Sequence, residues 1–581
     1  MALAFSSDGI SITITGIGTD STTGALTIPS TMDSLPVTAI GIAAFASLSG
    51  LTSVSIPNSV TSIGYYAFHG CSGLTSVTIG NSVTSIGESA FQATGLTSVT
   101  IPANVTVIGI NAFSLNYTLN SITVDAANSS YSSNGGVLFN KAQTTLHAFP
   151  GGKIGTYTIP NSVTTISSFA FYGCKNLTSV TLTNNLTNIG YYAFYDCSGL
   201  TSVTIPNSVT YIGIAAFSRC TGLTSVTLTQ NIFFNIINDI TFEGCILLKN
   251  VTIPANVKSI GFGAFHNCHT FTSVTIPDGV TSIGNFAFAN CSKLTSLTIG
   301  TGVTAIGEAV FQMCIILPSV TIPNSVTSIG AWAFDRCSKL AIVTIPDYVA
   351  NRSQLTSIGY MAFRNCIALA DVKSLTSTDD VQSTSVRFPY SLKSIGGGAF
   401  LGCSELTSVM ISPDVTSLGG AAFKYCTGLT SVTIDQSSEL TTIPPVTFYG
   451  CSGLTSVTVP NKVTFIGESA FGECISLTRL TLPDSVTAIG PMSFANCTTL
   501  TSVPINKNVT SIGYGAFQGC ILLTSATFSD CISYIGNSAF ERCTSLKSVI
   551  LPNIINPKHG TYIGYLATDA FYGDQVTINW F

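Results

Sequence analysis

The side chains of this 581-residue chain with most capacity for chemistry are its 18 cysteines. A thiolate can act as a nucleophile, bind a metal or form a disulfide. Seventeen of the cysteines, however, stand three residues after a phenylalanine that recurs along the chain, usually every 23 residues, and only Cys531 lies outside this pattern. Free cysteine is among the most buried residue types, so this spacing predicts a ladder of buried, reduced thiols. In an oxidising compartment, neighbouring thiols of the ladder could instead form disulfides if their geometry brought them together. The predicted thiol ladder includes Cys71, Cys174, Cys197, Cys220, Cys268 and Cys291.

Histidine beside cysteine is the second candidate for chemistry. His266 and His269 flank Cys268 in the segment FHNCHTF. A metal site would need these side chains to converge on one point. We expect the cysteine to point into the interior and both histidines to occupy exposed turn positions. The sequence therefore predicts no metal site.

Motifs of known catalytic mechanisms are missing from the sequence. It contains no G-x-S-x-G nucleophile motif, phosphate-binding loop or dinucleotide fingerprint. Carboxylates such as Asp278 and Asp484 occur singly in expected turns, not in the pairs that acid–base catalysis requires. The sequence predicts a protein that is not an enzyme and binds no cofactor.

The cysteines belong to a repeated unit that runs along nearly the whole chain. A phenylalanine, usually preceded by alanine, marks 21 units, and 13 of the 20 gaps between these phenylalanines are 23 residues long. A fixed period of this length is typical of a solenoid, in which each unit buries its apolar side chains against its neighbours. The phenylalanines are predicted to stack as a second ladder, which includes Phe68, Phe194, Phe217 and Phe288.

Residues 51–73, LTSVSIPNSVTSIGYYAFHGCSG, are a representative unit. Val54 and Ile56 alternate with polar residues, which is the periodicity of a strand. Gly64 stands four residues before the phenylalanine and is expected to allow a turn with positive φ. The spacing of the residues around Phe68 predicts one short helical or 3₁₀ turn. The unit is therefore predicted to contain two short strands, two turns and one helical turn.

This unit resembles the BspA-like leucine-rich repeats, also called the Treponema pallidum type. The resemblance rests on the pattern LxxVxIPxxVxxIGxxAFxxC and extends from about residue 26 to residue 572. It implies a leucine-rich repeat solenoid of short parallel strands, turns and short 3₁₀ or helical segments. It also implies a protein displayed at the cell surface or secreted, which attaches to other proteins. The residues that carry the pattern are Leu51, Val54, Ile56, Pro57, Val60, Ile63, Gly64, Ala67, Phe68 and Cys71.

The predicted domain organisation is one solenoid with a cap at each end. Residues 1–38 are expected to form an N-terminal cap, residues 39–572 about 21 repeat units, and residues 573–581 a C-terminal cap or a truncation point. Insertions at 125–157 and 374–391 lengthen two units. The first is expected to form strands in the segments GGVLFNK, TTLHAFP and GTYTIP, and the second is a polar loop.

The insertions and one apolar segment are the irregular features in which function could reside. Neither insertion contains a nucleophile next to a base, so neither favours an enzyme. Residues 230–239, QNIFFNIIND, are unusually apolar and are expected either to repack the core or to form a contact surface.

Composition narrows the possible partners. Charged residues make up only 8% of the chain, and the net charge is −5, so the basic surface that nucleic acid requires is missing. No run of apolar residues is long enough to span a membrane, and no signal peptide is visible at the start. Nucleic-acid binding and membrane insertion are therefore not expected. The missing signal leaves open an unrecognised export route, a larger parent protein or an intracellular location.

The exposed strand positions carry serine and threonine, and these hydroxyls are the predicted binding face. About 21 units with strands about 4.8 Å apart would give a surface roughly 100 Å long. Many weak polar contacts to an extracellular protein or glycan would add up by avidity. The alternative is a structural protein whose copies assemble into filaments or layers, because few charges keep them apart. The predicted face is represented by Thr52, Ser53, Ser55, Thr201, Ser202, Thr204, Thr455, Ser456 and Thr458.

Overall fold

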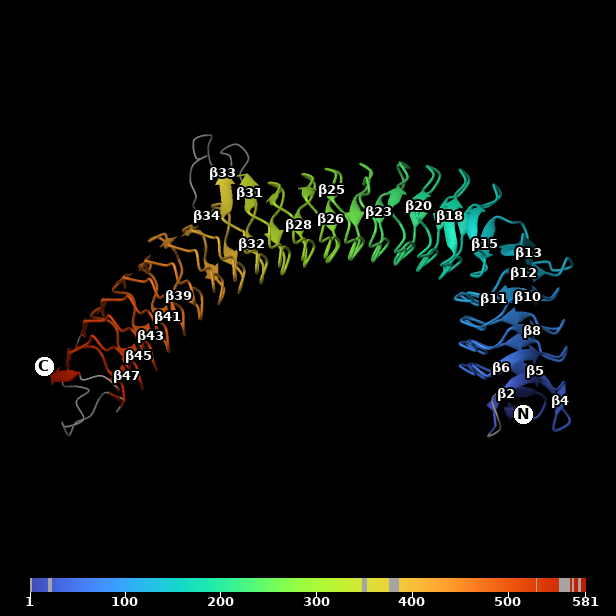
Figure 1. Cartoon of the computed structure of the whole chain (residues 1–581), viewed down its shortest axis with the longest axis horizontal. Coiled ribbons are helices and arrows are strands. Elements are labelled where there is room, and N and C mark those ends of the chain that lie inside the picture. Colours follow the sequence, from blue (N-terminus) through green and yellow to red (C-terminus); the bar gives the residue numbers. More distant parts are fainter. Residues whose placement is uncertain are drawn as a thin grey trace. The chain divides into compact units, whose positions relative to one another are not determined.

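The chain forms a β-solenoid, whose successive coils are visible in the cartoon of the computed structural model (Figure 1). The structure describes residues 3–18, 23–346, 353–375, 386–528, 530–552, 565–566, 569–572 and 576–580. Its contacts divide the chain into unit 1, Met1–Phe271, and unit 2, Thr272–Phe581. Each unit is described by itself.

Two columns of parallel strands run through each unit. The face strands carry the L-x-x-V-x-I motif, and the short strands end in the isoleucine that precedes Gly64 and its equivalents. Ser202 pairs with Ser225, and Ser511 pairs with Tyr534, so equivalent residues of consecutive coils lie opposite each other. This register confirms the predicted solenoid of about 23 residues per coil.

The strands of unit 1 have the following bounds. The first strands, at the end predicted as a cap, are β1 Leu3–Ser7, β2 Ile12–Ile17 and β4 Thr31–Met32. The face strands are β3 Gly24–Thr27, β6 Leu51–Ser55, β8 Ser76–Thr78, β10 Ser98–Ile101, β12 Ser121–Val124, β16 Gly155–Thr158, β18 Leu177–Thr181, β20 Ser202–Thr204 and β22 Ser225–Thr227. The short strands are β5 Leu35–Ile40, β7 Ser62–Ile63, β9 Ser85–Ile86, β11 Val107–Ile108, β17 Thr165–Ile166, β19 Asn188–Ile189, β21 Tyr211–Ile212, β23 Ile236–Ile237 and β24 Ser259–Ile260. The first insertion adds β13 Tyr131–Asn134, β14 Val137–Asn140 and β15 Thr145–Ala148.

Unit 2 repeats the same two columns. Its face strands are β25 Ser273–Thr275, β27 Ser296–Thr298, β29 Ser319–Thr321, β31 Ile342–Pro346, β33 Asp371–Leu375, β34 Val386–Arg387, β36 Ser408–Ile411, β38 Ser431–Ile434, β40 Ser456–Thr458, β42 Arg479–Thr481, β44 Ser502–Pro504, β46 Ser525–Thr527, β48 Ser548–Leu551 and β50 Thr577–Trp580. Its short strands are β26 Ser282–Ile283, β28 Ala305–Ile306, β30 Ser328–Ile329, β32 Ser357–Ile358, β35 Ser394–Ile395, β37 Ser417–Leu418, β39 Thr442–Ile443, β41 Phe465–Ile466, β43 Ala488–Ile489, β45 Ser511–Ile512, β47 Tyr534–Ile535 and β49 Tyr565–Leu566. Most of the second insertion, residues 376–385, lies outside the described residues.

The segment around each phenylalanine is a turn, so the predicted helical turn is wrong: no helix occurs in the described part of the chain. Tyr66 and Gly70, two residues before and after Phe68, have φ angles of 57° and 70°. A left-handed residue cannot continue a right-handed helix. The conformation is retained even where a β-branched residue makes it costly, as at Val446 with φ 50°. We call this segment the phenylalanine turn.

Hydrogen bonds between coils hold the phenylalanine turns in register. The N–H groups of Tyr66, Phe68 and Gly70 donate to carbonyl oxygens of the next coil at 2.9, 2.8 and 2.8 Å. The residues between them donate to carbonyl groups three residues back in their own coil, as in His69 to Tyr66 at 3.0 Å. Each turn therefore pairs its backbone alternately with the next coil and with itself, which explains why several residue types accept positive φ there.

The glycine four residues before the phenylalanine is required by close packing, and the expectation of positive φ at Gly64 is wrong. The left-handed residues lie at other positions of the turn. A Cβ atom on Gly64 would lie 2.7 Å from the backbone carbonyl carbon of Gly41, in the preceding coil. Contacts under 3.0 Å are essentially never seen for real Cβ atoms. Glycine is therefore the residue that lets successive coils approach.

The core contains the two side-chain ladders. The phenyl rings of Phe194 and Phe217 stack with centroids 5.1 Å apart and planes 3° apart, and the rings of Phe288 and Phe311 stack at 5.6 Å. Offset aromatic stacking adds about 0.5–1.5 kcal/mol per pair beyond burial. These phenylalanines are fully buried. The stack therefore ties consecutive coils together within each unit.

Candidate functional site

The cysteines lie in the interior and are free thiols, with Cys531 exposed. The Sγ atom of Cys220 donates to the backbone carbonyl oxygen of Phe194 at 3.0 Å, one coil back, and Cys268 makes the same contact with Phe242 at 3.2 Å. Burial raises the pKa of the equivalent thiol of Cys71 to about 11. A thiol of raised pKa is a weak nucleophile at neutral pH. The arrangement therefore supports packing rather than thiol chemistry.

Two coils that lack this cysteine replace its hydrogen bond with amide and hydroxyl groups. Asn116 is fully buried, and its Nδ2 atom donates to the carbonyl oxygens of Phe91 and Phe113 at 2.9 and 3.1 Å. Its Oδ1 atom accepts from the backbone N–H of Thr94 at 2.6 Å. The carbonyl of Phe91 is thus bonded as in a cysteine-containing coil. Thr94 and Asn116 stand three residues after Phe91 and Phe113, where most other coils have the ladder cysteine.

The histidines near Cys268 are not in the expected environment. His266 and His269 are half-buried, not exposed. Burial lowers the pKa of His266. Among the described residues, no cluster of three or more His, Cys, Asp or Glu side chains has an arrangement that could hold a metal ion.

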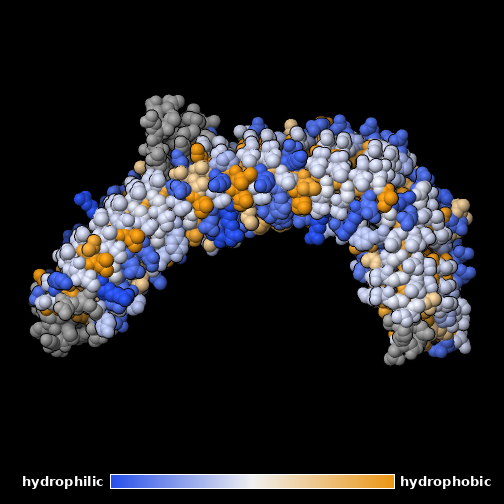
Figure 2. Space-filling view, in the orientation of Figure 1, coloured by the Kyte–Doolittle hydropathy of each residue, from blue (hydrophilic) through white to orange (hydrophobic). Residues whose placement is uncertain are grey.

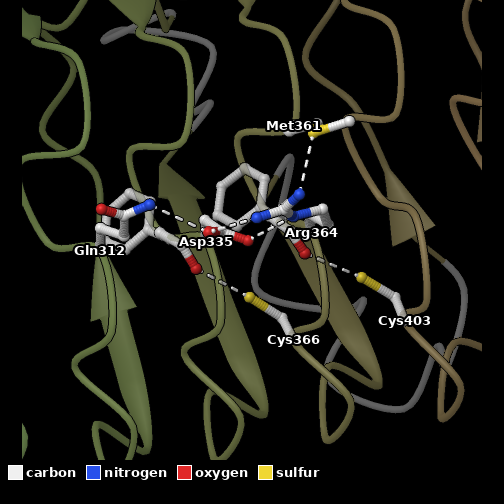
Figure 3. Close-up of polar contacts among 8 residues, drawn as sticks. Gln312, Asp335, Met361, Arg364, Cys366 and Cys403 are labelled. Atoms are coloured by element: carbon white, nitrogen blue, oxygen red, sulfur yellow. Dashed lines mark hydrogen bonds and ion pairs between the residues drawn. The ribbon is translucent and has the colours of Figure 1, made fainter.

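A buried ion pair in unit 2 escaped sequence analysis. Figure 3 shows Asp335 between Gln312 and Arg364, which come from the coils before and after it. The Nε atom of Arg364 lies 2.7 Å from Oδ1 of Asp335, and its Nη2 atom lies 2.9 Å from Oδ2. Gln312 donates to the same carboxylate at 3.0 Å. The carboxylate is 1% exposed and fully bonded, so we assign it a structural role.

The common feature of these three residues is their position, one residue after the phenylalanine in consecutive coils. The phenylalanine repeat therefore contained the signal that they are neighbours. A glutamine, an aspartate and an arginine in successive coils at this position form a polar ladder. Ser218 and Glu243 make an equivalent contact in unit 1, at 2.7 Å.

The predicted hydroxyl face lies on the exposed side of the face strands. Thr201, Ser202 and Thr204 are exposed, whereas Val203 between them is buried. Thr455, Ser456 and Thr458 have the same exposure in unit 2, and Thr52, Ser53 and Ser55 form the same column near the start of unit 1, with Ser53 partly covered. Much of the surface in Figure 2 is pale, as expected for serine, threonine and glycine.

The hydroxyl groups of this face are not equivalent, contrary to the uniform array that the repeat suggests. The Oγ1 atom of Thr201 donates to the carbonyl of Thr178 at 3.3 Å, and that of Thr455 donates to the carbonyl of Thr430 at 3.2 Å. The first threonine of the motif therefore supports the backbone of the preceding coil. Within the described part of the chain, the hydroxyls of Ser202 and Thr204 make no hydrogen bond. Thr100 and Thr123, at the position of Thr204, differ because their hydroxyls bond to each other at 2.9 Å. Hydroxyls such as those of Ser202 and Thr204 are therefore the ones that remain available for a ligand.

One part of the face in unit 2 is hollowed. A shallow depression of about 500 Å³ lies over β42, β44 and β46. It is lined by backbone and side chains of the face strands, including Thr481, Ser502 and Thr527. Arg479 is the cationic residue in this lining. The depression therefore combines hydroxyl groups with one guanidinium, a donor-rich surface suited to carbonyl or hydroxyl oxygens.

The apolar segment 230–239 is divided between core and surface. Phe234 and Ile237 are buried, whereas Ile232 and Phe233 are 76% and 71% exposed. The segment thus repacks the core and also places two large apolar side chains on the surface of unit 1.

The regular coils match a known repeat family. A model of the "BspA type Leucine rich repeat region" matches six times, at residues 28–141, 143–270, 235–370, 347–435, 376–486 and 464–572. These matches cover more than half of the chain. The chain belongs to the BspA-type leucine-rich repeat family.

Solved structures of leucine-rich repeat proteins are similar to this chain. A leucine-rich repeat protein from Bacteroides ovatus is 26% identical, with a TM-score of 0.54 over 78% of this chain and 98% of that chain. One from Eubacterium ventriosum is 25% identical, with a TM-score of 0.42 over 57% of this chain and 91% of that chain. A leucine-rich cell surface protein from Faecalibacterium prausnitzii is 24% identical, with a TM-score of 0.30 over 83% and 95%. No curated protein matches the chain.

In the described residues of this BspA-type chain, no helix is long and apolar enough to cross a membrane.

Proposed function

We propose that this protein is a non-enzymatic binding protein that acts at the cell surface or after secretion. The outer hydroxyl columns of the face strands would contact an extracellular protein or glycan. The observation that carries the proposal is the depression over β42, β44 and β46, where free hydroxyls surround Arg479 on the predicted face. Membership of a leucine-rich repeat family supports a binding role.

The chemistry of the face favours polar partners. Exposed hydroxyls both donate and accept hydrogen bonds, so they fit the hydroxyl groups of a glycan or the main chain of a protein. Charged residues are only 8% of the chain, so long-range electrostatic attraction contributes little. Binding would rest on many short-range contacts and on simultaneous contact with several coils.

The test is a binding screen against matrix proteins and a glycan array, followed by two matched variants. Thr481→Glu places a charge in the depression, and Thr204→Glu places the same charge on the same column in unit 1. We expect Thr481→Glu to weaken binding at least tenfold and Thr204→Glu to have a smaller effect. Equal weakening would assign binding to the whole face. Unchanged binding in both variants would contradict the role of the hydroxyl face.

Self-association is the second candidate function. It is favoured by the low content of charged residues and by the exposed apolar side chains of Ile232 and Phe233. Electron microscopy across a concentration series separates the two functions. Isolated particles at all concentrations favour a binding protein, whereas ordered filaments or layers favour a structural one.

A further inference from the structure

The hydrogen-bonded ladder of phenylalanine turns is interrupted at one coil of unit 1. In the coil before the interruption, the N–H groups of Ser89, Phe91 and Ala93 donate to the next coil at 3.1, 3.0 and 3.0 Å. In the described part of the chain, the equivalent N–H groups of Asn111 and Phe113 donate to no protein acceptor. They point to the place where the next phenylalanine turn would lie.

The first insertion causes this interruption. The coil that follows Phe113 contains β13, β14 and β15 and reaches Phe149 without forming a phenylalanine turn. Phe149 nevertheless occupies a ladder position, because its ring stacks on Phe171 at 4.8 Å and its N–H donates to Ala170 at 2.7 Å. The strand ladder that begins at β1 ends at β11, and a new one begins at β13.

A cavity of about 300 Å³ occupies the space of the missing turn. The coil of Phe113 forms one wall, and residues 167–169 of the coil of Phe171 form the opposite wall. Apolar side chains, including Ile108 and Leu138, complete the lining. The volume is at the lower end for small-molecule sites and leaves room for roughly ten water-sized groups.

Five polar side chains line this cavity, those of Asn111, Ser114, His147, Ser167 and Ser168. The hydroxyl of Ser114 donates to the carbonyl oxygen of Phe169 on the opposite wall at 3.4 Å, and that of Ser168 accepts from the N–H of Tyr191 at 3.2 Å, so the other three side chains are the ones considered for a ligand. The Oδ1 atom of Asn111 is buried and has no hydrogen-bond partner. The hydroxyl of Ser167 lies 3.3 Å from Nδ1 of His147, and both residues line the cavity. Burial lowers the pKa of His147, so the ring is neutral at pH 7. An unsatisfied buried acceptor costs about 1–3 kcal/mol, and a ligand that donates to it removes that cost.

The lining selects for a neutral ligand with amide groups. Two backbone N–H groups require acceptors, and Asn111 Oδ1 requires a donor, so a complementary ligand must supply both. Among the described residues, no lysine, arginine or carboxylate lines the cavity, which disfavours phosphate or carboxylate ligands. In the preceding coil, the equivalent N–H groups of Ser89 and Phe91 donate to the carbonyl oxygens of Ile110 and Ala112. The natural partners of such N–H groups are therefore carbonyl oxygens of alternate residues in a polypeptide.

We propose that this cavity is a binding site for a short, uncharged peptide segment that replaces the missing turn. Two of its main-chain carbonyl groups accept the N–H groups of Asn111 and Phe113, and a main-chain N–H donates to Oδ1 of Asn111. The pair formed by Ser167 and His147 contacts the opposite side of the peptide. The volume of about 300 Å³ holds two or three small residues.

The test uses acetyl-trialanine amide as the probe and the full chain as the receptor. We expect calorimetry to detect binding, and hydrogen–deuterium exchange to show protection of the peptide that contains residues 109–115. Asn111→Gly removes the side-chain acceptor but keeps the backbone, since glycine accepts the φ of 66°. This substitution should weaken binding of the probe about fivefold, the usual effect of losing one hydrogen bond.

Two further variants and one competing probe complete the design. Ser167→Gly introduces the residue that most coils have at this position, and it should also weaken binding. Ser89→Gly makes the same backbone change as Asn111→Gly in a closed part of the ladder and should leave binding unchanged. Failure of acetyl-trialanine amide to bind at millimolar concentration would overturn the proposal. Preferential binding of N-acetylglucosamine to the same site would overturn the assignment of a peptide.

Discussion

The Sγ atom of Cys197 donates to the backbone carbonyl oxygen of Phe171 in the preceding coil, at a distance of 3.1 Å. The same contact recurs at Cys474 and Phe448, at 3.3 Å, within unit 2. The thiol fills the space beside the phenylalanine ladder and also satisfies a carbonyl group. Cysteine is suited to this position because it is small, largely apolar and still a weak donor.

Alkylation should distinguish Cys531 from the other cysteines. The ladder thiols are buried, and burial raises the pKa of those such as Cys71, Cys197 and Cys497, so their reactive thiolate form is scarce at pH 8, whereas Cys531 is exposed. We expect iodoacetamide to modify one cysteine per folded chain and all 18 after denaturation. Mass spectrometry of the intact protein gives the count. Rapid modification of several ladder cysteines in the folded protein would show that the core opens easily.

The ion pair between Asp335 and Arg364 should make a large contribution to the stability of unit 2. Arg364→Met leaves a carboxylate that is 1% exposed without its cation. We expect a loss of about 3 kcal/mol in the free energy of unfolding, as for other broken buried pairs. Lys393→Met is the matched control, because Lys393 and Asp414 form an exposed pair worth less than about 1 kcal/mol. Similar losses in both variants would mean that the buried pair has no special role.

Close packing of the coils should make Gly213 intolerant of a side chain. A Cβ atom there would lie 2.6 Å from the backbone carbonyl carbon of Gly190. We expect Gly213→Ala to destabilise the protein by about 1–3 kcal/mol through overpacking. Gly16→Ala is the control, because its added carbon would be 3.4 Å from its nearest neighbour. Urea denaturation measures both, and a stable Gly213→Ala variant would contradict the requirement for glycine.

The buried histidines should make the protein less stable in mild acid. Burial lowers the pKa of His147 and of His266, so the unfolded chain binds protons at a higher pH than the folded chain does. Stability should therefore fall as the pH decreases below about 6.5 and should level off below the folded-state pKa values. When both histidines are replaced with glutamine, the denaturation midpoint should change less between pH 7 and pH 5. An unchanged pH dependence would assign the effect to other groups.

The period of the sequence was sufficient to predict the solenoid, its two columns of strands and the inward position of the cysteines. The conformation of the phenylalanine turn could not be predicted in this way. Tyr66 and Val446 have little in common, yet both have positive φ because hydrogen bonds to the next coil require it. Residue type at those positions therefore carries almost no signal.

At the candidate sites, too, the repeat predicts which residues are exposed, whereas their hydrogen bonds depend on the three-dimensional structure. The repeat indicated which hydroxyls are exposed, but the bond from Thr201 to the preceding coil depends on a distance that no pattern contains. Phe149 was missed as a ladder position because the insertion displaces it from the period. The alanine–phenylalanine pair at 148–149, 22 residues before Phe171, was the signal that could have found it.

The interruption after Phe113 also limits how far a disturbance can travel along unit 1. In a linear array each coil is stabilised by its two nearest neighbours, so cooperativity is only as strong as the weakest junction. The N–H groups of Asn111 and Phe113 contribute nothing to the junction with the next coil. Under mechanical load or limited proteolysis, the coils before β13 would therefore unravel as one block and those after it as another. The insertion would thus set the boundary between two segments of the array that unfold in separate steps.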